Sequence, residues 1–411
     1  MKESLNLTPP PEELPRTKLK TFGLILLMAV LGMAPPLSTD LYMPALPGMA
    51  SYFQASVSIT NLTLTGFFFF MAVGILICGP LSDKYGRKPI LLTSLAVYAL
   101  FSVFCALSSS IFQLIFFRII QALGAGGMLS ISMALAKACF EGKLRITVIS
   151  VAQAMTMFAP MAAPILGAFL LKVATWRASF WILAVIGVLC FAAASFMKET
   201  LPTQERLSEK WYKTFNRLPV IAKNKSFSLF LLFASLFSLP FMAYLALSSY
   251  VYIDFFDLDA TIYSYYFAAN AFLSIFAPTL YIKLHGRVRT QTIIYGCAAL
   301  AAVSGLAILI LGCRAALFFF ICFAPFTFLG SLMRPLSTQT LLAEQDGDTG
   351  SVSSLINFVQ TAFGSLGMLI GSLPWPNLPQ GLGIIILSSI TLAMLIWLGL
   401  TRFCRPLKGL N

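Results

Sequence analysis

Charge is what this sequence lacks most. Only 10% of its 411 residues are Asp, Glu, Lys or Arg, whereas 58% are hydrophobic and the mean hydropathy is +0.86. Soluble globular domains carry about 25% charged residues. A chain with so few polar side chains cannot cover its own surface against water. A soluble fold is therefore excluded, and lipid is expected to surround the protein.

The residues of common catalytic and metal sites are scarce as well. The only histidine, His285, lies in a basic loop, so a Ser-His or metal site inside the bilayer lacks its usual parts. No G-x-x-x-x-G-K-[ST] run is present, which argues against an ATP-driven pump. The eight cysteines form no C-x-x-C pair. We therefore expect no enzyme, no metal site and no cofactor, with a proton gradient as the driving force.

The net charge of +13 does not indicate nucleic-acid binding. The basic residues lie in short blocks between apolar stretches and do not form a basic groove with interleaved aromatic residues. Residues 1–20 are polar and mixed in charge, and they do not resemble a cleaved signal peptide.

Twelve apolar stretches are long enough to span a bilayer, since about 20 residues suffice. The sequence therefore predicts an all-α membrane protein. The stretches are 22–46, 57–80, 89–108, 112–138, 146–171, 178–197, 227–251, 262–283, 291–312, 316–342, 352–373 and 382–401.

Basic residues predict the orientation of these spans. With a cytoplasmic N-terminus, only Lys172, Arg177 and Arg314 fall outside, and Arg118 and Arg334 lie within spans. All the other basic residues among the 28 fall on the cytoplasmic side, as the positive-inside rule requires. We expect a monomeric, multi-pass protein of the bacterial inner membrane with both termini in the cytoplasm.

The longest polar stretch separates six spans from six, as in transporters built from internal repeats. The repeat itself is faint: residues 79–87 have a degenerate counterpart, two residues longer, in 277–287. The expected division is an N-terminal tail (1–20), a six-helix bundle (21–197), a cytoplasmic linker (198–225), a second six-helix bundle (226–402) and a C-terminal tail (403–411).

The first apolar stretch contains one carboxylate. Residues 37–47 read LSTDLYMPALP and place Asp40 in the far half of the first span. A charge at the centre of a membrane helix costs roughly 2.5–3.5 kcal/mol on a translocon-type scale, and such residues usually face a cavity and carry function. We expect Asp40 to exchange protons.

The loop between the second and third spans carries the most specific motif. Residues 79–89 read GPLSDKYGRKP, in which the glycines allow a tight turn, Asp83 can cap a helix N-terminus and Arg87 can pair with Asp83. The run resembles the signature loop of the major facilitator superfamily. That resemblance implies two bundles that rock between alternating states, with a gating loop formed by Gly79, Asp83, Gly86 and Arg87.

A second motif lies in the fourth span, where residues 118–124 read RIIQALG. Arg118 and Gln121 are three residues apart and so share one helix face. Arg118 needs an anion or carbonyl groups, and Asp40 is the carboxylate placed within a span; the alternative is an arginine that extends to the membrane interface. The run resembles the R-x-x-Q-G motif of proton-coupled drug antiporters, with Ala122 at the first glycine, which implies a role for Arg118 in proton relay.

A third motif lies in the fifth span. Residues 159–168 contain Pro160, Pro164 and Gly167 among small side chains, which allow helices to approach closely. A simple packing seam is one interpretation. The run also resembles the antiporter motif of drug exporters, with alanine at three of the usual glycines. Together with T-D-x-Y-x-P-A-L-P at 39–47, it resembles the bicyclomycin/chloramphenicol-resistance branch.

These features predict a proton-coupled antiporter that exports lipophilic, cationic or neutral drugs. Export or import of a specific metabolite, such as a siderophore, peptide or sugar derivative, remains the alternative, and amide side chains that would suit it are sparse. Arg334 either faces the cavity or binds carbonyls freed by Pro335. The cavity-lining candidates are Tyr42, Phe241, Met242, Tyr244, Asn270, Arg334 and Asn357.

Overall fold

The described chain is almost entirely helical. The computed structural model describes residues 21–140, 142–206, 217–344 and 349–403. Within them, twelve helical segments are long and apolar enough to cross a membrane, which confirms the predicted all-α membrane fold. The elements are α1 (Thr21–Asp40), η1 (Met43–Ala45), α2 (Leu46–Tyr52), α3 (Val57–Tyr85), α4 (Arg87–Leu107), α5 (Ile111–Cys139), α6 (Gly142–Val173), α7 (Arg177–Ser195), η2 (Thr203–Glu205), α8 (Arg217–Ala222), α9 (Lys225–Ser249), η4 (Tyr250–Phe255), α10 (Ala260–Leu284), α11 (Thr290–Leu311), α12 (Ala316–Ala343), α13 (Thr349–Gly371) and α14 (Leu378–Phe403).

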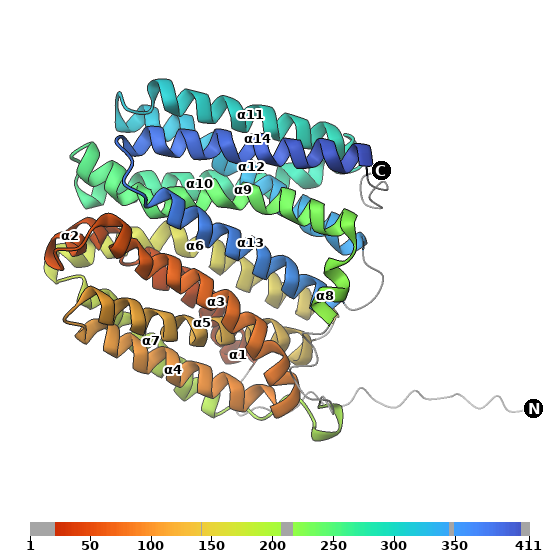
Figure 1. The fold of residues 1–411 in the computed structure, drawn as a ribbon. Helices are drawn as coiled ribbons and strands as arrows, with labels where there is room; N and C mark the ends of the chain where they lie inside the picture. The colour runs from red at the N-terminus through yellow and green to blue at the C-terminus, as the bar shows by residue number, and fades with distance from the viewer. Residues whose placement is uncertain (1–20, 141, 207–216, 345–348, 404–411) are drawn as a thin grey trace, which may run out of the picture.

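Figure 1 shows the spans as two groups, α1 to α7 and α9 to α14. The groups meet where α3 packs against α13 and where α6 packs against α10. Of the expected tails and linker, residues 1–20, 207–216 and 404–411 lie outside the described part of the chain.

Successive spans alternate in direction, so the connections gather at two ends of the molecule. Residues 53–56 and 256–259 lie at one end, which we call the α2 end. Gly86 and residues 285–289 lie at the other, which we call the α8 end (Figure 1).

Polar side chains fix where several spans begin. Ser56, Ser110, Asn224 and Asp259 precede α3, α5, α9 and α10, and each side chain accepts a hydrogen bond from a backbone N–H two or three residues later. Such caps satisfy donors that the first helical turn leaves free. They place the helix starts at positions that hydropathy alone does not define.

Two glycines support the faint internal repeat. Gly86 follows α3 with φ +102°, and Gly286 follows α10 with φ +76°. Both values lie in the left-handed region, where glycine has no steric penalty. Pro80 and Pro278 lie inside the two preceding helices. A glycine with positive φ therefore lies at the C-cap of the second helix in one half and one residue beyond the C-cap in the other.

The first helix of each half is irregular near the α2 end. The predicted stretch 22–46 extends to Tyr52 and is interrupted after Asp40, where α1 gives way to η1 and α2. In the other half, α9 continues into η4, a π-helical turn. The interruption after Asp40 positions the candidate site.

Candidate functional site

Asp40 is the last residue of α1, directly before the interruption. Pro44 and Pro47 lie within the first two positions of η1 and α2. Backbone N–H groups in the first turn of a helix have no partner inside that helix, so proline costs no hydrogen bond there. The Asp40 side chain is 4% exposed, and its Oδ1 accepts a hydrogen bond from Thr39 Oγ1 at 2.9 Å. No ion pair to Asp40 is found among the described residues. This carboxylate is therefore buried without a countercharge.

Gly167 brings α6 against the interruption. A Cβ at this position would overlap the backbone oxygen of Leu41, the residue after Asp40. Backbone cannot turn aside as a flexible side chain does, so the contact requires glycine. Pro160 and Pro164 lie earlier in the same helix. The antiporter-like motif thus lies beside the end of α1.

Arg118 is fully buried on α5. Its guanidinium carbon lies 4.0 Å from the ring centroid of Phe67, 4.9 Å from that of Tyr42 and 5.6 Å from that of Phe180. A desolvated cation over an aromatic ring gains about 2 kcal/mol. The burial rules out the interfacial alternative. Within the described chain, Arg118 forms no ion pair with Asp40, so the expected partnership is not formed in this conformation.

Hydrogen bonds connect Arg118 to Tyr98 of α4, and the side chain of Tyr98 separately bonds α1. Arg118 Nη1 donates to Gln121 Oε1 at 2.7 Å, and Gln121 Nε2 donates to Ser102 Oγ at 2.6 Å. Ser102 Oγ donates to the Tyr98 carbonyl at 2.6 Å, and the Tyr98 hydroxyl shares a 2.6 Å hydrogen bond with Ser38. Ser38 lies two residues before the buried carboxylate. Arg118 and Gln121, which were expected to share one helix face, are hydrogen-bonded directly to each other.

Tyr42 belongs to this cluster. Its hydroxyl shares a hydrogen bond with Thr63 Oγ1 at 3.0 Å, and the Thr63 carbonyl accepts a longer bond from Arg118 Nε at 3.4 Å. Tyr42 is fully buried. Instead of facing open space, it links α3, the end of α1 and the buried cation.

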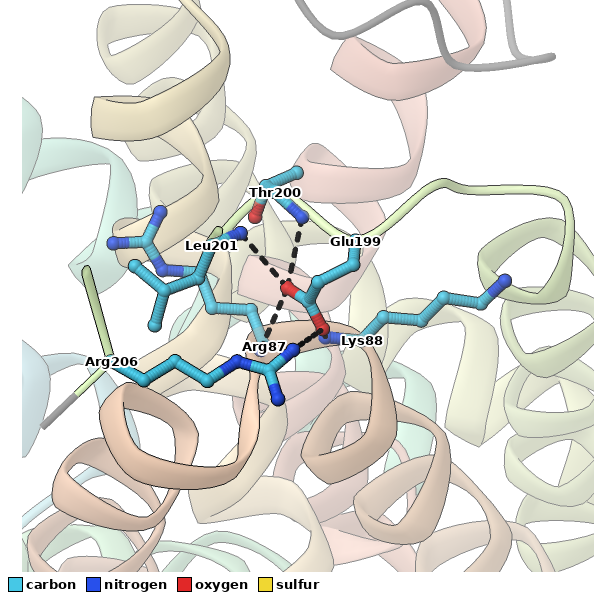
Figure 2. A network of polar contacts seen from close by, with 6 residues as sticks. All are labelled: Arg87, Lys88, Glu199, Thr200, Leu201 and Arg206. Carbon is cyan, nitrogen blue, oxygen red and sulfur yellow. Dashed lines mark hydrogen bonds and ion pairs between the residues drawn. The ribbon is translucent and has the colours of Figure 1, made fainter. Parts of the chain in front are cut away.

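At the α8 end, the gating loop contacts a residue of the linker. Glu199 Oε1 accepts a hydrogen bond from the backbone N–H of Arg87 at 3.0 Å, and Oε2 accepts one from that of Lys88 at 3.2 Å (Figure 2). Arg206 lies 4.0 Å from the same carboxylate. Free N–H groups and the helix dipole make the start of α4 a favourable place for a negative charge. A Cβ on Gly86 would displace the Glu199 carboxylate from α4, and the φ of +102° at this position itself favours glycine.

The other gating-loop residues have separate surroundings. Asp83 is exposed, and the described residues contain no ion pair between it and Arg87. Arg87 Nε is buried without a hydrogen-bond partner. Gly79 faces Ser130, whose Oγ would lie 3.2 Å from an added Cβ. Glu199, rather than Asp83, caps α4 in this conformation.

The second half contains a cavity of about 160 Å³ lined by α9, α12 and α13. Three predicted cavity residues, Phe241, Met242 and Arg334, come together in its wall. The guanidinium of Arg334 makes no hydrogen bond or ion pair with any residue that the structure describes. The carbonyl-binding alternative for Arg334 is therefore not realised here.

The remaining predicted cavity residues do not line this space. Tyr244 is buried and stacks on Phe323, with ring centroids 3.9 Å apart and planes 19° apart. Asn270 is also buried. Asn357 Nδ2 donates to the Ser353 carbonyl of its own helix at 2.9 Å.

Hydrogen bonds join the two halves at the α2 end. Asn61 Nδ2 donates to the Ala246 carbonyl at 3.0 Å and to Ser372 Oγ at 2.9 Å, whereas Asn61 Oδ1 is buried without a donor. Ser264 Oγ donates to the Pro164 carbonyl at 2.8 Å. We call these contacts the α2-end seam.

The family model described as Major Facilitator Superfamily matches residues 22–372, which is most of the chain. The chain belongs to the major facilitator superfamily. It is therefore a secondary transporter for small molecules and not an enzyme, as the sequence predicts, and the expected fold of two six-helix bundles is confirmed.

Among relatives of this major facilitator chain is the Bacillus subtilis (strain 168) "Uncharacterized MFS-type transporter YdgK", 30% identical over 390 residues that cover 92% of this chain and 96% of the relative. The Haemophilus influenzae "Bicyclomycin resistance protein homolog" is 30% identical over 294 residues, 70% and 72% of the two chains. This similarity confirms the predicted resemblance to the bicyclomycin-resistance branch. A solved D-xylose-proton symporter shares the fold, with a TM-score of 0.70, 12% identity and coverage of 94% of this chain and 99% of that one.

Several residues that complete the sites of this major facilitator protein were missed by sequence reasoning. Phe67 and Phe180 cover Arg118 from two other helices, and Glu199 caps α4 from beyond the sixth span. The position of Glu199, an acid directly after the sixth predicted span, was the available signal for it. The two phenylalanines carry no signal of their own among 37.

Proposed function

We propose that this transporter exports lipophilic small molecules, drugs among them, in exchange for protons by alternating access. The observation that supports the proposal best is Asp40, a buried carboxylate with no countercharge at the end of α1. An ion without a partner is costly within a membrane, so this group suits reversible proton binding. The relative named as a bicyclomycin resistance protein homolog supports a drug as cargo.

We further propose that the α8 end faces the cytoplasm of a bacterial inner membrane and that the protein works as a monomer. The basic residues between spans favour this orientation. The α2-end seam would then close the outward side, and the cavity in the second half would receive cargo from the cytoplasm. Protonation of Asp40 would act on the seam through the contact between Leu41 and α6, since α6 also binds α10 through Pro164 and Ser264.

Transport by inverted vesicles tests this function. A pH gradient should drive uptake of a lipophilic drug by the parent, and Asp40→Asn should reduce that uptake at least tenfold because the side chain can no longer release a proton. Exchange of labelled for unlabelled drug without a gradient should persist in the variant. Asp254→Asn, at the α2 end of the seventh span, is the matched control and should couple normally. Full gradient-driven uptake by Asp40→Asn would rule out the assignment.

The size of the cavity favours a second candidate, the transport of one specific metabolite. Its volume of about 160 Å³ is below the 300–1,000 Å³ usual for drug-sized ligands. Thermal stabilisation of the purified protein across a compound panel separates the two functions. Many unrelated lipophilic compounds should stabilise a drug exporter, whereas one chemical family should stabilise a metabolite transporter.

A further inference from the structure

The wall of the cavity holds a cation that the protein does not neutralise. Arg334 is the charged residue among those that line the space, and its guanidinium has no partner in the described chain. Arginine presents a fork of donors that matches a carboxylate or phosphate. Although the Arg334 side chain is long and flexible, its guanidinium bonds no carboxylate and no backbone carbonyl of the described residues.

Two further polar side chains in the same wall lack partners. Thr327 Oγ1 is buried without any hydrogen bond, and Thr327 is 2% exposed. Gln360 is 9% exposed, and its side chain forms no hydrogen bond within the part of the chain that the structure describes. Leaving the buried Thr327 hydroxyl unpaired costs about 1–3 kcal/mol. Hydroxyl and amide groups beside a free guanidinium form a donor set that an anion would satisfy.

The α9 side of the wall is mainly apolar, although Ser238 on α9 and three further hydroxyl residues of α12 and α13 also line the cavity. Phe237, Phe241 and Met242 of α9 supply the large apolar side chains of this wall. A cavity of about 150 Å³ holds one benzene-sized ring. At about 160 Å³, this cavity has room for one ring or a short alkyl chain next to the acidic group.

We propose that the cavity binds a small amphiphilic acid, whose carboxylate pairs with Arg334 and whose ring or alkyl chain packs on Phe237, Phe241 and Met242. This inference rests on the proposed function, because it takes the acid to be the molecule that the transporter exports. It replaces the expected cationic or neutral cargo, because a cation would meet Arg334 without a countercharge. Proton and cargo then occupy separate halves, so coupling passes through the bundle contacts and not through competition for Asp40.

Equilibrium binding to the purified full-length protein, without any gradient, tests the site. The probes are 4-propylbenzoate, 4-propylbenzamide and 4-propylbenzylamine, which share one ring and one chain and differ in charge. The parent should bind the acid about 10- to 100-fold more tightly than the amide, as expected when a hydrogen bond to a charged group is lost, and the amine more weakly still. Arg334→Gln should bind acid and amide equally, and Arg334→Lys should keep part of the preference.

Controls separate this site from the coupling mechanism. Arg314→Gln removes an exposed positive charge that does not line the cavity and should keep the full preference. Asp40→Asn should also keep it, even though that variant no longer couples to protons. Amide binding by Arg334→Gln shows that the variant is folded. Equal binding of acid and amide by the parent, or an unchanged preference in Arg334→Gln, would overturn the proposal. Stabilisation by sodium sulfate as strong as by the aryl acid would also overturn it, because the apolar wall would then contribute nothing.

Discussion

The two halves of this transporter treat an intramembrane arginine in opposite ways. In the first half, Arg118 is fully buried against three aromatic rings and the Gln121 amide. In the second half, Arg334 borders a cavity and has no partner among the described residues. A cation whose contacts come from the protein stabilises one packed arrangement, whereas an unpartnered cation is available to a ligand. Position within a span therefore does not by itself distinguish a structural charge from a binding charge.

The halves agree in how their helices pack. Gly167 on α6 brings that helix onto the backbone oxygen of Leu41 in the first span, and Gly367 on α13 does the same to Leu239 in the seventh. In each half the fifth helix thus approaches the first at a glycine. The contact in the first half adjoins Asp40, and the one in the second half adjoins the cavity wall. One packing rule therefore serves both the candidate proton site and the candidate cargo site.

The largest expected effect contrasts the two arginines. Arg118→Ala should lower the free energy of unfolding by about 3 kcal/mol, since it removes the ring contacts and leaves Gln121 Oε1 with only the distant Cys105 thiol as a donor. Arg334→Ala should change it by less than about 0.5 kcal/mol, as expected for a side chain without partners. Thermal unfolding of both purified variants measures the difference. Equal losses would show that the contrast between buried and free cation is wrong.

The next effect tests the shared packing rule. Gly167→Ala and Gly367→Ala should each cost about 1–3 kcal/mol, because the added methyl group overlaps backbone. Gly399→Ala, where nothing lies within 4 Å of an added Cβ, is the control and should be neutral or stabilising. Only Gly167→Ala should also shift the pH dependence of transport, because Leu41 follows Asp40. A shift of the same size in Gly367→Ala would contradict the division of roles between the halves.

The smallest effects concern the α8 end. Glu199→Gln should destabilise the protein by about 1 kcal/mol, because it removes the negative charge at the start of α4. Arg206→Gln should cost less than about 0.5 kcal/mol, since its 4.0 Å ion pair joins two side chains that are 29% and 25% exposed. Unfolding at low and high salt checks both values. A larger loss for Arg206→Gln would mean that the ion pair, and not the helix cap, holds the gating loop.

Much of the fold could be predicted from the sequence because a bilayer imposes it. Apolar runs of about 20 residues must be helices, since lipid offers no partner to a free backbone group. The direct bond between Arg118 and Gln121 followed from helical spacing in the same way, because both residues lie on one element.

What could not be predicted depends on contacts between elements. The helix interruption after Asp40, the rings over Arg118 and the Glu199 cap each join residues distant in sequence. The spacing of residues along one helix shows which of them share a face. It does not show which of many phenylalanines will contact an arginine on another helix. The free state of Arg334 is of the same kind, since nothing next to it in sequence shows whether a carboxylate on another span will reach it.

The α2-end seam has a consequence for the energies of the transport cycle. Asn61 makes two hydrogen bonds there while its Oδ1 stays buried without a donor. The unsatisfied acceptor costs about 1–3 kcal/mol, which offsets much of what the two bonds contribute. Separating the bundles at this end would admit water to that oxygen and recover the loss. The seam therefore holds the two bundles together less strongly than its two hydrogen bonds alone would, which lowers the energy needed to separate them at this end.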